Sequence, residues 1–285
     1  MYKRILVASG GGPWSDAAVT YAMSLAARSG AEVCILTVLT IPSAVATLEG
    51  MVFTDQLLES IEDEGKILLL QEAAQAERAG VAHATILKWG NIPEAVLQTA
   101  EEEECDLIVL GSRQMAGWKR LRMGSITNAV AAKAPQPVLV IKHPAPVPSL
   151  WRRVLVATGG SPWSDAAVDY TLALAQDQHF EVCLMHVDSV RSRRGNSRGF
   201  AQGKNLLDFA AARAAAAGIA YEATLCSGDV VTTILETATS KQCDAIVLGS
   251  RGLTGWKRLM IGSISNAVAV KAPLPVLIVK RFLPA

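Results

Sequence analysis

Residues 105–142 read CDLIVLGSRQMAGWKRLRMGSITNAVAAKAPQPVLVIK, and residues 243–280 read CDAIVLGSRGLTGWKRLMIGSISNAVAVKAPLPVLIVK. The two stretches align without a gap, and 27 of the 38 positions are identical. A match of this length is an internal duplication, which predicts two similar domains in tandem. Each copy contains a glycine-rich loop, and the copies differ inside it, where Gln114 in the first half corresponds to Gly252 in the second.

The size and composition of the chain fit two compact domains, which we expect at 1–143 and 150–285. The apolar fraction is 51%, typical of a globular protein. A net charge of +1 gives no general attraction for nucleic acids or membranes, and no apolar run is long enough to span a bilayer. The five cysteines and four histidines show no metal-ligand spacing. We therefore expect a cytoplasmic protein without a nucleic-acid partner, a membrane partner or a metal site of its own.

Apolar runs alternate with amphipathic runs throughout both halves of the chain. Such alternation is typical of strand–helix units in a parallel sheet that is covered on both faces. Right-handed crossovers then favour a doubly wound order. The sequence therefore predicts an α/β fold with two doubly wound sheets. The expected strands are 3–8, 32–39, 83–87, 107–110 and 138–141 in the first half and 153–157, 181–187, 221–225, 245–248 and 276–279 in the second; the expected helices are 15–29, 54–79, 93–103, 126–134, 164–176, 204–217, 231–240 and 264–272.

Local signals mark the helix starts and one basic segment. Ser15 and Ser164 each follow Pro-Trp, and Ser125 and Ser263 each follow a glycine, so all four are predicted helix N-caps. Residues 191–203 read RSRRGNSRGFAQG and have no apolar period, which predicts a basic loop. This loop is either a solvated surface segment or a lid whose arginines approach an anionic ligand.

The glycine-rich loop of the second half has the pattern of an anion site. Gly249 and Gly252 follow a strand, and after nine intervening residues Gly262 and Ser263 open a helix. The free amides at a helix start suit phosphate oxygens. The carboxyl ends of the strands are where doubly wound folds bind ligands. Arg251, beside these glycines, is a candidate phosphate contact, with a salt bridge as the alternative.

The pattern G-x2-G-x9-G-S, preceded by IVLGSR and followed by PVLIVK, resembles the universal stress protein family. The tandem arrangement resembles the two-domain members of that family. The resemblance implies five-stranded sheets of order 3-2-1-4-5, with strands 138–141 and 276–279 pairing across a pseudo-twofold axis. It also implies an adenine nucleotide, ATP or AMP, held by this loop in the nucleotide-binding members, with Mg²⁺ accompanying ATP. The candidate cofactor-binding residues are Gly249, Arg251, Gly252, Gly262, Ser263, Val187 (through its backbone, toward the adenine) and Gly159 in the second half, and the weaker equivalents Gly111, Gly124, Ser125, Val38 and Gly10 in the first.

Two departures from the family pattern bear on nucleotide binding. Nucleotide-binding members usually end the first strand in an Asp that contacts the nucleoside, but Gly10 and Gly159 occupy that position here. Losing such a hydrogen bond costs about 1–3 kcal/mol when its partner is buried. In the first half, the Gln114 side chain would enter the phosphate space. We therefore expect nucleotide in the second half, the alternatives being that both halves bind or that neither does.

Three classes of function are compatible with these patterns. The first is a nucleotide-binding stress-response regulator with at most slow ATP hydrolysis. The second is a module that acts through protein contacts alone, which the two missing aspartates favour. The third is an ATP-using enzyme, but the sequence shows no nucleophile–base set or paired carboxylates for such chemistry. Beyond the nucleotide, the expected partners are a second copy of the chain in a homodimer and a protein partner that the sequence does not identify.

Overall fold

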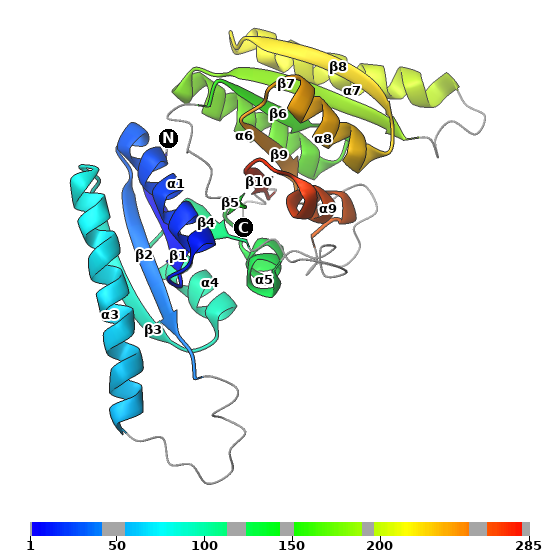
Figure 1. Cartoon of the computed structure of the whole chain (residues 1–285). Helices are drawn as coiled ribbons and strands as arrows, with labels where there is room; N and C mark the ends of the chain where they lie inside the picture. Colours follow the sequence, from blue (N-terminus) through cyan, green and yellow to red (C-terminus); the bar gives the residue numbers. More distant parts are fainter. Residues whose placement is uncertain are drawn as a thin grey trace, which may run out of the picture. The chain divides into compact units, whose positions relative to one another are not determined.

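The expected alternation of strands and helices is confirmed in the computed structural model (Figure 1). The structure describes residues 2–41, 55–112, 124–142, 151–189, 197–250 and 261–280. The elements of the first repeat are β1 (Arg4–Ser9), α1 (Pro13–Ser29), β2 (Glu32–Leu39), α3 (Asp55–Arg78), β3 (His83–Trp89), α4 (Ile92–Glu102), β4 (Leu107–Gly111), α5 (Ser125–Lys133) and β5 (Val138–Ile141). Those of the second are β6 (Arg153–Ala157), α6 (Pro162–Gln178), β7 (Glu181–Ser189), α7 (Ser197–Ala216), β8 (Tyr221–Gly228), α8 (Val230–Ser240), β9 (Ala245–Gly249), α9 (Ser263–Lys271) and β10 (Val276–Val279).

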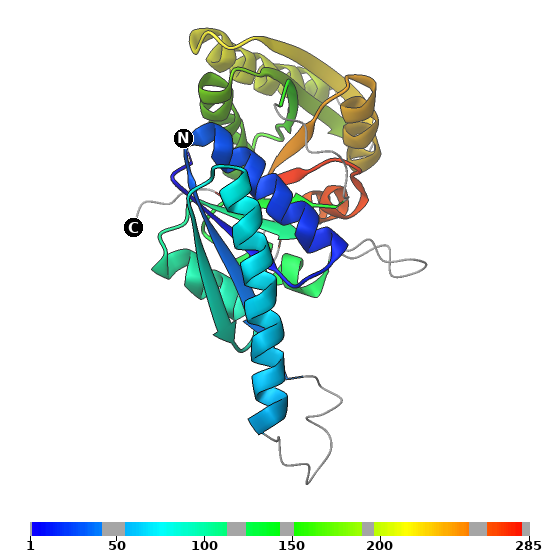
Figure 2. The ribbon, with the colours of Figure 1, turned by 60° about the vertical axis from the view of Figure 1, so that its left-hand side comes forward.

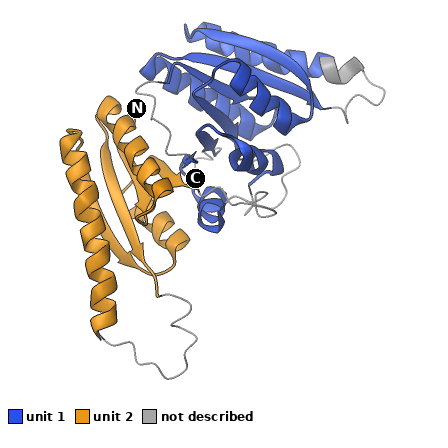
Figure 3. Ribbon diagram, viewed as in Figure 1, with its two compact units in different colours: residues 1, 112–285 blue, residues 2–111 orange. Residues whose placement is uncertain are grey.

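The chain forms two compact units, and their border does not coincide with the border between the repeats. One unit comprises residues 2–111, and the other comprises residues 112–285 together with residue 1 (Figure 3). Helix α5 and strand β5 of the first repeat therefore belong to the same unit as the whole second repeat. The reason is the antiparallel pairing of β5 with β10, in which Leu139 lies opposite Leu277. This pairing of the two last strands was expected from the family resemblance and is confirmed.

The strands of each unit follow a doubly wound order. In the unit of residues 2–111 the order is β3-β2-β1-β4, with parallel pairing throughout. In the other unit the order is β5-β10-β9-β6-β7-β8, parallel except for the β5–β10 pair. The α/β fold class is thus confirmed, and in the second repeat the order β8-β7-β6-β9-β10 is the predicted 3-2-1-4-5.

Helices cover both faces of each sheet, as right-handed crossovers require. In the first unit α1 and α3 lie side by side on one face and α4 on the other (Figure 2). The amide of Gln75 on α3 donates to the Thr20 hydroxyl on α1 at 3.1 Å. In the second unit α6 and α7 share one face, and α8 and α9 share the other (Figures 1 and 2). The strands between these layers form the core, and their central residues, such as Leu6 and Leu155, have no exposed surface.

Some expectations about element ends are wrong. Helices α1 and α6 begin at Pro13 and Pro162, two residues before the predicted Ser15 and Ser164. Proline suits the first helical position because the amide it lacks would have no partner there. Ser164 lies inside the first turn, where its hydroxyl donates to the carbonyl of the true N-cap, Ser161, at 2.8 Å. Part of the expected basic loop is also helical, since α7 begins at Ser197.

Candidate functional site

The start of α9 is the centre of the second-repeat candidate site. Gly262 is the N-cap residue, and no side chain of the described residues caps the helix. Ser263, predicted to be the N-cap, is instead the first helical residue, because the chain turns at the glycine. The Gly262 amide donates to the Ser250 carbonyl at 2.7 Å, which ties the helix start to the end of β9. The amides of the first helical turn have no partner within the helix, and they carry the positive end of the helix dipole.

Gly249 ends β9 for a reason that the sequence did not reveal. A Cβ atom on this residue would lie 2.4 Å from the Trp163 carbonyl oxygen and 2.8 Å from the Ser164 amide nitrogen. Only glycine therefore lets β9 approach the first turn of α6. Gly111 has the same relation to Trp14 in the first repeat, with a Cβ–O separation of 2.3 Å. The glycine is required by packing of the protein against itself, and not only by a ligand.

Ser250 is a feature of this site that sequence reasoning missed. Ser250 is 1% exposed, and its hydroxyl has no hydrogen-bond partner in the described part of the chain. Its amide donates to the Val279 carbonyl at 2.8 Å and fixes the backbone. Leaving a buried hydroxyl unpaired costs free energy, so such a group is expected where a ligand completes the bonding. The signal was the Gly-Ser-Arg triplet, which both copies share.

The ends of β6 and β7 bring Gly159 and Val187 into one region. Gly159 follows β6, and nothing lies within 4 Å of the position that its Cβ would occupy. The preceding residue, Thr158, donates its amide to the Met185 carbonyl at 2.8 Å. The Thr158 carbonyl lies 2.9 Å from Nδ1 of His186. Val187 is half-buried and does not end its strand as expected, because β7 continues to Ser189. The pairing of β7 with β8 through Asp188 and Ser189 extends the strand.

In the first repeat the candidate residues are divided between the two compact units. Gly10, Val38 and Gly111 belong to the unit of residues 2–111, whereas Gly124 and Ser125 belong to the other. Val38 precedes the last residue of β2, and Gly10 follows β1 with nothing within 4 Å of its Cβ position. Gly124 is the N-cap of α5, and Ser125, like Ser263, is the first helical residue and not the predicted cap.

Ser112, the first-repeat counterpart of Ser250, lies close to the start of α5. The Ser112 hydroxyl lies 3.9 Å from the position that a Cβ on Gly124 would take. Like Ser250, it is buried and has no hydrogen-bond partner in the parts of the chain that the structure describes. Both glycine loops therefore share the same polar feature at a helix start.

The end of β1 carries a carboxylate that the second repeat lacks. Glu72 on α3 is buried, and its Oε1 accepts a hydrogen bond from the Ser9 hydroxyl. Burial raises the pKa of the Glu72 carboxyl; the Ser9 hydrogen bond opposes this change, and the charge of Asp16 adds to it. The equivalent position in α7 is Ala210. The sequence did not predict this contact, because 63 residues separate its two partners.

Several residues named from the sequence lie outside the described residues. These are Arg251, Gly252 and Gln114 in the glycine loops, and residues 191–196 of the basic segment. In the described residues, no cluster of three or more His, Cys, Asp or Glu side chains could hold a metal ion. No helix of that part is long and apolar enough to cross a membrane.

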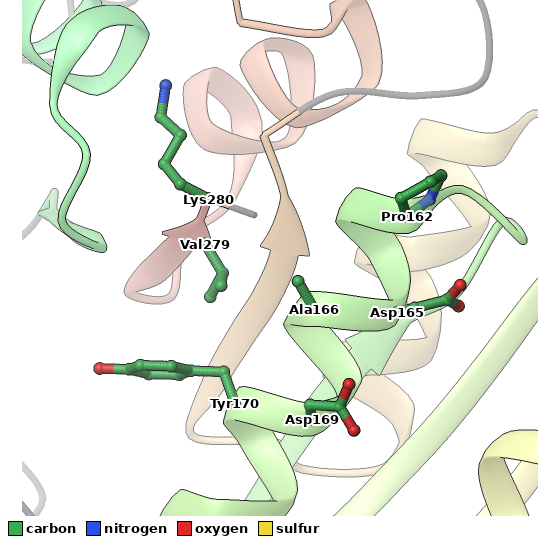
Figure 4. A pocket seen from close by; sticks show the side chains of 7 residues that line it. All are labelled: Pro162, Asp165, Ala166, Asp169, Tyr170, Val279 and Lys280. Carbon is green, nitrogen blue, oxygen red and sulfur yellow. The ribbon is translucent and has the colours of Figure 1, made fainter. Parts of the chain in front are cut away.

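A hollow of about 620 Å³ lies beside α6 and the end of β10. Figure 4 shows Ala166 and Val279 facing each other across it, with Asp165 and Asp169 directed away from Val279. Asp169 forms an ion pair with Arg213 on α7. The hollow shares no residue with the candidate site. Its lining is Pro162, Asp165, Ala166, Asp169, Tyr170, Val279 and Lys280.

The order of the strands and the duplicated glycine-rich sequence define a tandem doubly wound α/β protein. A sequence model of the Universal stress protein family matches residues 1–142 and 150–280, so the chain belongs to this family.

Similar proteins agree with this assignment. Universal stress protein YxiE of Bacillus subtilis is 30% identical over 153 aligned residues, covering 46% of this chain and 100% of that protein. A universal stress protein of Mycolicibacterium smegmatis is 26% identical over 97% of this chain and 96% of its own length. The crystal structure of a universal stress protein from Archaeoglobus fulgidus matches with a TM-score of 0.79 and 25% identity, over 98% of this chain and 96% of that one. The last two span both repeats of this chain.

Proposed function

We propose that this universal stress protein binds an adenine nucleotide, ATP or AMP, in its second repeat. The phosphates lie at the start of α9, and the nucleoside lies toward the ends of β6 and β7. The observation that carries the proposal is the buried, unpartnered Ser250 hydroxyl beside the uncapped first turn of α9. A helix start alone is common, but a second buried donor at the same place points to a ligand with several acceptor oxygens.

The donor set supports an anion as the ligand. The first-turn amides of α9 and the hydroxyls of Ser250 and Ser263 can all donate, and phosphate oxygens only accept. Ser263 is exposed, so a ligand can reach it from solvent. The described residues at this helix start include no carboxylate, so Mg²⁺, if it enters with ATP, is held by the phosphates. In this proposal the residues bind and orient the nucleotide, and no group is assigned to its hydrolysis.

The nucleoside end of the site is weaker than the phosphate end. The Val187 backbone is assigned to the adenine, as the family resemblance implies, and Gly159 leaves open the place where family members carry the aspartate. Without that carboxylate, the affinity falls by about 1–3 kcal/mol, or roughly tenfold to a hundredfold. We therefore expect binding in the micromolar range or weaker.

Calorimetric titration of ATP and AMP into two matched variants tests the proposal. Ser250→Ala removes the buried hydroxyl of the second repeat, and Ser112→Ala removes its counterpart in the first. We expect Ser250→Ala to weaken binding about tenfold, the usual effect of one hydrogen bond to a charged group, and Ser112→Ala to leave it unchanged. Equal effects of the two variants, or a native chain that binds neither nucleotide, would refute binding in the second repeat.

The second candidate function is a protein-interaction module that binds no nucleotide. The glycines at the two strand ends favour it, since Gly10 and Gly159 both lack the nucleoside-contacting carboxylate. A ligand that binds only the folded chain raises its melting temperature by mass action. A native chain whose melting temperature is unchanged by millimolar ATP and AMP, and that releases no nucleotide on denaturation, supports this second function.

A further inference from the structure

The outer face of α3 carries apolar side chains that no described residue of its own unit covers. Ile67 is 55% exposed and Leu70 is 69% exposed, and Ala74 is also exposed. The opposite face of the helix holds buried residues such as Leu69 and Ala76, which pack toward the sheet. Residues 67, 70 and 74 are spaced by three and four positions, so they form one stripe along the helix. Figure 2 shows α3 as an outer layer of this unit.

Charged residues flank this apolar stripe in a self-complementary order. Asp63 and Lys66 precede it, and Glu77 and Arg78 follow it. Along the helix, the charges therefore read negative, positive, apolar stripe, negative, positive. All four side chains belong to exposed residues. Lys66 contacts Glu62 at 2.8 Å and Asp63 at 3.7 Å on its own helix, and such exposed pairs contribute little to stability.

An antiparallel second copy of α3 can match this order. Around a twofold axis close to residues 70 and 71, Asp63 of one chain lies near Arg78 of the other, and Lys66 lies within one turn of Glu77. Because of the twofold symmetry, each of these pairs occurs twice in the interface. The two Leu70 side chains meet at the axis. Ile67 packs beside Ala74, and this large–small pair allows close approach of the two helices. The matched stretch, residues 63–78, is about 24 Å long at 1.5 Å per residue.

The second repeat shows that the fold itself does not require this surface. At the positions of Ile67 and Leu70, helix α7 carries Asn205 and Asp208. Asp208 pairs with Lys204 at 2.8 Å, as expected for a solvated helix face. The counterparts of Glu77 and Arg78 are both alanines, at 215 and 216. The apolar stripe and its flanking charges are therefore properties of α3 alone.

We propose that the chain forms a homodimer through antiparallel contact of the α3 helices. The apolar stripe supplies the centre of the interface, and the charge order selects an antiparallel second copy over an unrelated helix. The interface is small, so the dimer is in concentration-dependent equilibrium with the monomer. This dimer does not depend on the nucleotide proposed above.

Sedimentation velocity across a range of concentrations tests the interface with a matched pair of variants. Ile67→Glu places a charge in the stripe, and Asn205→Glu places the same charge at the equivalent position of α7. We expect the native chain and Asn205→Glu to dimerise alike, and Ile67→Glu to stay monomeric. Far-UV circular dichroism checks that helix content is unchanged. A native chain that is monomeric at every concentration, or an Ile67→Glu variant that dimerises normally, overturns the proposal.

Charge reversal tests the antiparallel orientation. Asp63→Arg alone places two cationic groups together across the interface, and Arg78→Asp alone places two acidic groups together. Each single variant should weaken the dimer about tenfold, and the double variant should return to within about threefold of the native dissociation constant, as double-mutant cycles show for paired charges. Failure of the double variant to recover would show that the helices do not meet in this orientation.

Discussion

Lys142 and Lys280 make the same contact in opposite directions. The Nζ of Lys142 donates to the Val270 carbonyl at 2.6 Å, and the Nζ of Lys280 donates to the Ala132 carbonyl at 2.8 Å. Each lysine follows the last strand of one repeat, and each carbonyl lies in the last turn of the other repeat's final helix. A cation is favourable there because the helix C-terminus carries partial negative charge. The reciprocal contacts and the β5–β10 pairing together explain why the end of the first repeat packs with the second.

The two lysines differ in burial, and this difference predicts a pH dependence. Lys142 is 3% exposed, whereas Lys280 is half-buried. Burial lowers the pKa of Lys142 from 10.5 to about 8. The unfolded chain therefore binds this proton more strongly than the folded chain does. The free energy of unfolding then rises with pH between these two values.

The variant Lys142→Met should lose this pH dependence. We expect the native free energy of unfolding to increase, relative to that of the variant, by up to ~3 kcal/mol between about pH 8 and pH 10.5. Urea unfolding at a series of pH values measures the difference, and Lys280→Met, which removes the reciprocal contact at the more exposed lysine, serves as the control. Parallel pH profiles of the native chain and Lys142→Met would contradict the assignment of a lowered pKa.

Glu72 predicts a second pH dependence, with the opposite sign. Burial raises the pKa of its carboxyl in the folded chain. Its contribution to stability is therefore fully present below the ordinary pKa of glutamate and is lost as the pH rises through the raised value. Glu72→Gln keeps the shape of the side chain and an acceptor for Ser9 but cannot ionise. We expect this variant to gain stability relative to the native chain as the pH is raised from 4 toward neutrality.

Chemical unfolding followed by circular dichroism at several pH values measures this gain. Glu101→Gln, at an exposed position of α4, is the control. If Glu72→Gln follows the native profile from pH 4 to neutrality, the buried carboxyl does not titrate in the way proposed.

Much of the fold could be predicted from the sequence because local and repeated signals determine it. The duplication and the strand–helix alternation indicated two doubly wound parallel sheets, the family resemblance implied their strand order, and the position of Gly262 indicated the start of α9. The remaining features depend on packing between distant segments. The approach of Trp163 to Gly249, the burial of Ser250, and the contact of Glu72 with Ser9 leave no periodic pattern in the sequence. The division of the chain after Gly111 also depends on a strand pair, β5–β10, that is remote in sequence.

Two glycines of the site should respond very differently to a methyl group. Gly249→Ala places a Cβ against the Trp163 carbonyl, and that overlap should destabilise the protein by about 1–3 kcal/mol, as overpacking in a core does. Gly159→Ala meets nothing within 4 Å and should leave the melting temperature nearly unchanged. Thermal unfolding of the two variants compares them directly. A similar loss of stability in both would mean that the close packing at the end of β9 is not the cause.

The missing nucleoside carboxylate can be restored at Gly159. The position has room for a side chain, because nothing lies within 4 Å of its Cβ. It follows Thr158, whose carbonyl is next to His186 and therefore near Val187. If the nucleoside lies there, an aspartate regains a hydrogen bond to it. Gly159→Asp should then raise the affinity for ATP or AMP by about tenfold, or roughly 1.4 kcal/mol.

Isothermal titration of both nucleotides measures this gain, and Gly10→Asp provides the matched control in the first repeat. Gly10 also has nothing within 4 Å of its Cβ position, so the two substitutions are sterically comparable. A gain from Gly159→Asp alone places the nucleoside in the second repeat. A gain from Gly10→Asp alone would assign the nucleotide to the first repeat. A third outcome is that the native chain binds nucleotide while neither aspartate changes the affinity. In that case the nucleoside does not lie at the ends of β1 or β6, and the residues around the phosphates alone hold the ligand.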